Sequence, residues 1–277
     1  VYNIVKTVKQ GSAVENELAE APALSVISSG QMKGEKWHSW LERKPVQFTI
    51  LTTIAVAIGG VVQIVPMIVV KSNIPTISSV KPYSPLELEG RDIYIREGCN
   101  NCHSQMIRPF RSEVKRYGEY SKSGEYVYDH PFLWGSKRTG PDLMRIGGKY
   151  NDNWHFNHMW SPQRMDEKSV MPAYKWLFDN KAMDHSLIEK KMSVMVTLGV
   201  PYTDADIANA KKSIDEQSTK IEKSLYNDPD FVKSYEDSKK KAAAKGEDFV
   251  PMKDREIVAL IAYLQRMGTD IKVKKAK

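Results

Sequence analysis

The stretch Cys99-Asn100-Asn101-Cys102-His103 decides which class of protein this 277-residue sequence predicts. Its two cysteines are the only ones in the chain. Cys-x-x-Cys-His is the attachment motif of c-type haem, in which the thiols add across the two vinyl groups and the histidine becomes an axial iron ligand. One helical turn brings both sulfurs to the porphyrin edge while the imidazole turns toward the iron. We therefore predict one covalent haem c on Cys99 and Cys102, with His103 as an axial ligand.

Two other kinds of site use closely spaced cysteines. A thioredoxin-like dithiol needs a βαβ context, and no strand-like alternation precedes Cys99. A structural zinc site usually has four ligands, and the chain has no second cysteine pair. Because the motif contains both cysteines, no structural disulfide is expected elsewhere. A chance match to so short a motif is the remaining alternative.

A second strong signal precedes the motif, because residues 46–70 form a run of 25 residues without a charge. About 20 apolar residues suffice for a helix that crosses a bilayer. A buried core helix of this length without a polar face would need a much larger protein around it. We predict one transmembrane helix here, in which Gln63 and Pro66 are awkward residues.

Positive charges flank this run unequally, in a chain whose net charge is +7. Lysines and arginines in the loops beside a span favour the cytoplasmic side. Before the run lie Lys33, Lys36, Arg43 and Lys44, with Trp37 and Trp40 as interface anchors; after it lie Lys71 and Lys81. The N-terminal side is therefore expected in the cytoplasm. The remainder is expected in a periplasm-like compartment, where bacteria attach haem c.

The haem motif lies between two stretches with helical periodicity. Residues 86–98 carry Ile93 and Tyr94 on one side, and Gly90 would allow another helix to approach closely. Near the other end, residues 254–267 place apolar side chains at helical spacing, namely Ile257, Val258, Leu260, Ile261 and Leu264. This order resembles class I cytochromes c, whose first and last helices cross. Two ordinary surface helices would show the same periodicity.

The same resemblance suggests roles for a loop that follows the motif, Thr139-Gly140-Pro141-Asp142-Leu143. In class I cytochromes c, a proline carbonyl in such a loop accepts a hydrogen bond from the axial histidine, and a leucine packs on the haem. The resemblance thus implies these roles for Pro141 and Leu143. Satisfying the second ring nitrogen of an axial histidine orients the ring.

The sixth iron ligand is sought among methionines and histidines, because a thioether raises the reduction potential and suits electron transfer. Met171 lies 68 residues after His103 and precedes a proline, where class I cytochromes c place their axial methionine. It is the preferred candidate. Met144 follows the leucine expected to cover the haem, so it is less suitable. Met159 is a further candidate, and His155 or His158 would give the iron a second histidine ligand beside His103.

Arginines near the motif are candidates for the haem pocket. Arginine pairs well with carboxylates, so Arg108 and Arg138 could bind the haem propionates. Contacts with another subunit, or plain solvation, are equally compatible with the sequence.

Longer stretches of the chain match one family. They are CNNCHSQMIRPF (99–110), Arg111, Tyr117-Gly118, YVYDHPF (126–132), WGSKRTGPDL (134–143), Trp154-His155 and MPAY (171–174). In these residues the chain resembles the mono-haem subunit II, or O subunit, of cbb3-type cytochrome c oxidases. The match covers roughly residues 37–202 and the last helix.

The resemblance implies an electron-transfer subunit of a haem–copper oxidase in the bacterial inner membrane, with no catalytic residue of its own. Its implied partners are the catalytic subunit I, a diheme cytochrome c subunit, a cytochrome c donor and the lipid bilayer, with no nucleic acid. A membrane-anchored cytochrome c of another complex, such as nitric oxide reductase, is an alternative. An open-iron haem sensor or enzyme is another.

The chain departs from the family pattern in two places. Residues 203–247 form a long charged helical insertion, in which Lys239-Lys240-Lys241 and Ala242-Ala243-Ala244 are typical of an exposed helix end. We expect a solvated face there, with partner docking as the alternative. Residues 1–30 precede the expected start, and the helix-like 2–8 followed by a flexible linker suggests the tail of a subunit I fused upstream.

The predicted fold is therefore mostly α: a single N-terminal transmembrane helix, then a class I cytochrome c-like all-α domain with a long charged helical insertion. The predicted segments are a cytoplasmic tail or linker (1–32), a basic juxtamembrane segment (33–45), the transmembrane helix (46–70), a Pro-rich spacer (71–85), the cytochrome domain (86–267, with 203–247 inserted) and a basic tail (268–277).

Overall fold

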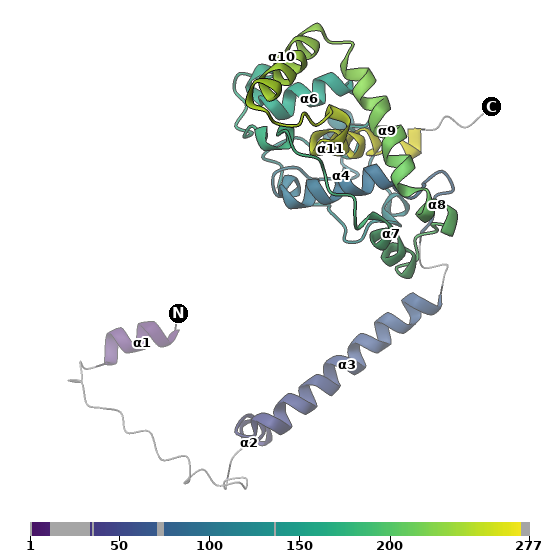
Figure 1. The fold of residues 1–277 in the computed structure, drawn as a ribbon. Coiled ribbons are helices and arrows are strands. Elements are labelled where there is room, and N and C mark those ends of the chain that lie inside the picture. The colour runs from purple at the N-terminus through teal and green to yellow at the C-terminus, as the bar shows by residue number, and fades with distance from the viewer. Residues whose placement is uncertain (1, 12–33, 35, 71–74, 136, 273–277) are drawn as a thin grey trace. The chain divides into compact units, whose positions relative to one another are not determined.

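The computed structural model describes residues 2–11, 34, 36–70, 75–135 and 137–272. The chain divides into two compact units, Val1–Lys71 and Ser72–Lys277. Every regular element in the described residues is helical, which confirms the mostly α prediction (Figure 1). The expected linker after α1 lies, apart from Gly11, outside the described residues, as does part of the basic tail.

The described residues of the first unit form α1 (Tyr2–Gln10), α2 (Trp37–Glu42) and α3 (Pro45–Val69). Proline is tolerated in the first turn of a helix, where its missing N–H costs no hydrogen bond, and Pro45 opens α3 there. Within the described part of the chain, α3 is the one helix long and apolar enough to cross a membrane. Its apolar side chains are exposed along its length, as a lipid-facing helix requires.

In the second unit, the residues that the structure describes form eight α-helices and short 3₁₀ turns. In chain order they are α4 (Pro85–Arg96), η3 (Cys99–Asn101), α5 (Arg111–Tyr117), η4 (Ser123–Tyr126), α6 (Asp152–Trp160), η5 (Pro162–Arg164), η6 (Lys175–Phe178), α7 (Ile188–Thr197), α8 (Asp204–Ala208), α9 (Ala210–Leu225), α10 (Pro229–Lys245), η7 (Met252–Asp254), α11 (Glu256–Arg266) and η8 (Asp270–Lys272).

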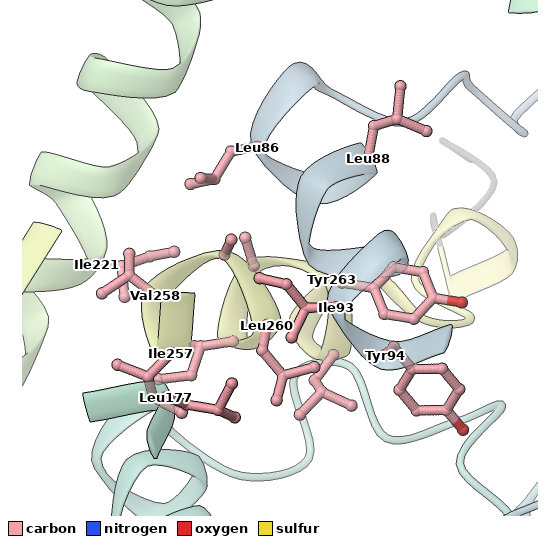
Figure 2. Close-up of a cluster of buried hydrophobic side chains, with 14 of the residues drawn as sticks. Leu86, Leu88, Ile93, Tyr94, Leu177, Ile221, Ile257, Val258, Leu260 and Tyr263 are labelled. Atoms are coloured by element: carbon pink, nitrogen blue, oxygen red, sulfur yellow. The ribbon is translucent and has the colours of Figure 1, made fainter. Parts of the chain in front are cut away.

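Helices α4 and α11 form the centre of this unit, and they cross as predicted. A Cβ atom at Gly90 would lie only 1.9 Å from the carbonyl oxygen of Ala259, so the two backbones touch at this glycine. Figure 2 shows apolar side chains of the two helices pointing toward one another, among them Ile93 and Leu260.

Ser84 caps α4 through a reciprocal capping box with Glu87.

The charged insertion is helical, as predicted, but it is also part of the core. Its helix α9 buries Ile214, Ile221 and Leu225 on one face, and Figure 2 shows Ile221 beside Val258 of α11. The prediction of an exposed end in α10 is wrong at Ala242, which is only 5% exposed. Ala242 shares a helix face with Phe231 and Tyr235, which are also buried. The lysines 239–241 and Ala243-Ala244 are exposed.

Candidate haem site

The Cys-x-x-Cys-His motif begins where α4 ends. Gly98 takes the left-handed conformation (φ 68°) that commonly terminates a helix, and the chain then tightens into η3. The N–H of His103 donates to the carbonyl of Cys99 at 2.9 Å, which closes one turn over the motif. The turn leaves Cys99 buried and Cys102 exposed.

The surroundings of the first cysteine argue against a reactive dithiol, and the available donor groups argue against a zinc site. Burial raises the pKa of the Cys99 thiol to about 12. Disulfide exchange needs a thiolate, which this burial disfavours. In addition, no group of three or more His, Cys, Asp or Glu side chains that could hold a metal ion occurs within the described residues.

The imidazole of His103 is oriented by the loop expected to hold it. Its Nδ1 lies 2.8 Å from the carbonyl oxygen of Pro141. A carbonyl can only accept, so Nδ1 carries the hydrogen and Nε2 keeps its lone pair. Burial lowers the pKa of His103, which favours the neutral ring that binds metals.

A glycine lets this loop approach the ring. A Cβ atom at Gly140 would lie 2.2 Å from Cε1 of His103, so no other residue fits there without moving the imidazole. The N–H of Gly140 also donates to the carbonyl of Cys102 at 3.0 Å. The loop is therefore hydrogen-bonded both to the motif backbone and to the histidine ring.

A buried carboxylate that the sequence did not single out connects the same two segments. Asp142 accepts hydrogen bonds from the Ser104 hydroxyl (2.6 Å) and the backbone N–H of Met106 (2.9 Å) with one oxygen, and from the N–H of Met144 (2.9 Å) with the other. Hydrogen bonds to a charged acceptor are stronger than neutral ones. In the sequence, the only sign of this role of Asp142 was that it lies within the Gly-Pro-Asp-Leu stretch.

The structure separates the methionine candidates. Met171 and Leu143, both half-buried, and Met159, which is buried, pack in the same apolar cluster as Cys99. Met144 instead belongs to a second small cluster with Ile107 and Tyr126. The structure thus brings Met171 and Met159, but not Met144, to the core that contains the motif.

The two candidate pocket arginines both pair with Glu113. Arg138 contacts it at 2.7 Å and also donates to the Ser104 hydroxyl and the carbonyl of Met106. Arg108 forms a second, closer ion pair with the same carboxylate. The hydrogen bond from Arg138, with that from Arg108, lowers the pKa of Glu113 to about 2. Contact of either arginine with a haem propionate stays a prediction.

Helix α6 carries two histidines with unsatisfied ring nitrogens. His155 is 1% exposed and its Nε2 has no hydrogen-bond partner, and Nδ1 of His158 also has none. The ring of His158 stacks on Trp154 with 4.6 Å between the ring centroids, and Trp154 stacks on Tyr150 with 3.9 Å between the centroids. Burial, with a smaller contribution from His103, lowers the pKa of His158.

These features fit a haem. Buried polar atoms normally have a partner, and the haem propionates are carboxylates that could accept from an imidazole. The close contact of Gly140 with the His103 ring, the burial of Cys99 and the apolar cluster beside it suit a large, mostly apolar ring with one metal.

Crossed terminal helices, a Cys-x-x-Cys-His turn between them and a histidine oriented by a proline carbonyl define the class: a class I cytochrome c-like domain, in a chain that also carries a membrane-type helix. A family model for the cytochrome c oxidase mono-heme subunit, FixO, matches residues 38–271. The chain therefore belongs to the FixO family, which confirms the resemblance to the mono-haem subunit of cbb3-type oxidases. No curated protein sequence matches the chain.

Proposed function

We propose that this chain binds its haem covalently through Cys99 and Cys102, with His103 and Met171 as axial ligands, and that it passes electrons from a cytochrome c donor to the catalytic subunit of the oxidase. The observation that carries the proposal is the contact of His103 Nδ1 with the Pro141 carbonyl, because it leaves the lone pair of Nε2 available to bind a metal. A bound haem supplies one iron that gains and loses a single electron.

The protein side chains have three tasks in this function. Pro141 and Gly140 keep the imidazole of His103 in one tautomer and one orientation. The thioether of Met171 favours the reduced iron and so raises the reduction potential. Leu143, with the apolar cluster around Cys99, keeps water away from the metal. With both axial positions filled by protein, no position is left for oxygen, so oxygen reduction belongs to the catalytic subunit.

We further propose that α3 anchors the chain in the bacterial inner membrane with its N-terminal side in the cytoplasm and the cytochrome domain in the periplasm. The excess of lysine and arginine before α3 supports this orientation. Bacteria attach haem c in the periplasm, which agrees with this orientation. This second argument depends on the Cys-x-x-Cys-His motif and not on the charges beside α3. A diheme cytochrome c subunit is a proposed neighbour and electron donor.

The test is a pyridine haemochrome assay and a reduced-minus-oxidised spectrum of the purified membrane complex, with haem staining of this chain on a denaturing gel. We expect a c-type spectrum and a haem stain that survives denaturation. Haem that leaves the denatured chain would contradict covalent attachment. Carbon monoxide binding at this haem would contradict two protein axial ligands and favour an open-iron sensor or enzyme.

A further inference from the structure

The segment that carries Met171 is not part of a helix, and few hydrogen bonds hold its backbone. Residues 169–174 lie in the connection between η5 and η6, and Val170 in this segment is 81% exposed. Pro172 has no N–H to donate. The N–H of Met171 donates weakly, at 3.3 Å, to the hydroxyl of Ser169, which belongs to the same segment. These contacts alone do not attach Met171 to the rest of the domain.

Gln163 makes the missing connection. Its side-chain amide Nε2 donates to two backbone carbonyls of the segment, those of Ser169 and Met171, both at 3.0 Å. An amide nitrogen has two hydrogens, so each carbonyl can receive one. Among the described residues, no other side chain outside 169–174 hydrogen-bonds to the backbone of this segment.

Gln163 is itself well placed to act as an anchor. It lies in η5, the turn that directly follows α6, and the preceding Pro162 is buried. The other end of the segment is attached to α6, since the N–H of Tyr174 donates to the carbonyl of Met159 at 2.9 Å. Gln163 and Met159 thus hold the two ends of the Met171 segment against α6 and the turn that follows it.

We propose that Gln163 is a positioning residue that keeps Met171 within reach of the iron and thereby determines how firmly the thioether stays bound in the oxidised protein. The inference rests on the proposed role of Met171 as axial ligand. Gln163 does not touch the metal and acts through the backbone of residues 169–171. Oxidised iron binds a thioether less firmly than reduced iron does, so weaker positioning should affect the oxidised state first.

The test uses the full chain, loaded with haem and solubilised in detergent. Gln163→Glu preserves the size of the side chain but removes its donors, and Gln163→Met removes them without adding a charge. Both variants should weaken the far-red absorption band of methionine-ligated ferric haem. They should also raise the affinity of the oxidised protein for added imidazole by roughly tenfold, about the effect of losing one to two ordinary hydrogen bonds. Arg164→Ala, in the same turn, is the matched control and should behave as the unmodified chain.

Wild-type imidazole affinity and an unchanged band in both Gln163 variants would overturn the inference. So would an effect confined to Gln163→Glu, because it would come from the added charge. Met171→Ala is measured alongside. If Met171→Ala leaves the band intact, the ligand assignment itself is wrong; if it abolishes the band while the Gln163 variants do not change it, only the role of Gln163 is refuted.

Discussion

The imidazole Nδ1 of His103 lies 2.8 Å from the carbonyl oxygen of Pro141, a residue 38 positions further along the chain. This contact determines which ring nitrogen can bind a metal, and it depends on a glycine, Gly140, that lies against the ring. The histidine is therefore oriented by protein atoms alone.

Replacing Gly140 should disturb this arrangement directly. In Gly140→Ala the new methyl group would overlap the imidazole, since the Cβ position is 2.2 Å from Cε1 of His103. We expect less haem incorporated per chain and an altered absorption spectrum of the remainder. Gly59→Ala in α3, where a Cβ meets nothing within 4 Å, is the control. Normal haem content and spectrum in Gly140→Ala would show that His103 is not held as described.

Removing both thiols should abolish covalent attachment. The double variant Cys99→Ala, Cys102→Ala is expected to lose all haem staining on a denaturing gel, because no other cysteine can replace them. We also expect a less stable cytochrome domain, measured by its unfolding midpoint in denaturant. The loss should be partial, because α9 and α10 add buried apolar side chains of their own to the core that contains Cys99. Retained staining would refute the attachment site.

Changing Met171 should change the reduction potential. Met171→His is expected to keep a six-coordinate low-spin iron at a lower potential, since imidazole favours the oxidised metal more than a thioether does. Met171→Ala should open the site to carbon monoxide. A potentiometric titration and the reduced spectrum check both outcomes. If Met171→Ala retains the wild-type potential and spectrum, Met159 is the next candidate because it lies in the same cluster.

The helix crossing should tolerate no side chain at Gly90. Its Cβ position is 1.9 Å from the Ala259 carbonyl oxygen, a backbone atom that cannot rotate away. Gly90→Ala should therefore lower the free energy of unfolding by about 1–3 kcal/mol or more, the usual cost of overpacking a core. Denaturant unfolding of the cytochrome domain measures this loss. The exposed Gly59→Ala again serves as control, and equal stability of the two variants would contradict a close crossing.

The cytochrome domain should lose stability in mild acid because of His155. Burial lowers the pKa of this histidine from 6.5 to about 4. The unfolded chain takes up the proton at higher pH than the folded one, so this contribution is present above pH 6.5 and is lost as pH falls toward 4. The shift corresponds to about 3 kcal/mol at most.

The test compares the free energy of unfolding at neutral pH with that near pH 4.5. The same comparison on His155→Leu isolates the contribution of this histidine. The variant cannot titrate at this position, so its stability should decline less between the two values. An equal decline in both proteins would show that His155 does not titrate in this range.

Features that depend on neighbouring residues can be predicted from the sequence. The spacing of Cys99, Cys102 and His103, the uncharged length of α3 and the apolar periodicity of α4 and α11 are local patterns. The structure has helices where the uncharged run and the two periodic stretches predicted them. The glycine at position 90 predicted a close helix approach, because an absent side chain is visible in the sequence.

Which groups far apart in the sequence meet in space follows from tertiary packing. Asp142 lies beside Ser104 and Arg138 beside Glu113 because packing brings separate segments together, and no local pattern specifies the opposing segment. The insertion shows the same limit: many of its residues are charged, yet one stripe of α9 and α10 is buried. A helix needs only a few apolar residues on one face to join a core, and that face is defined by its neighbours in space.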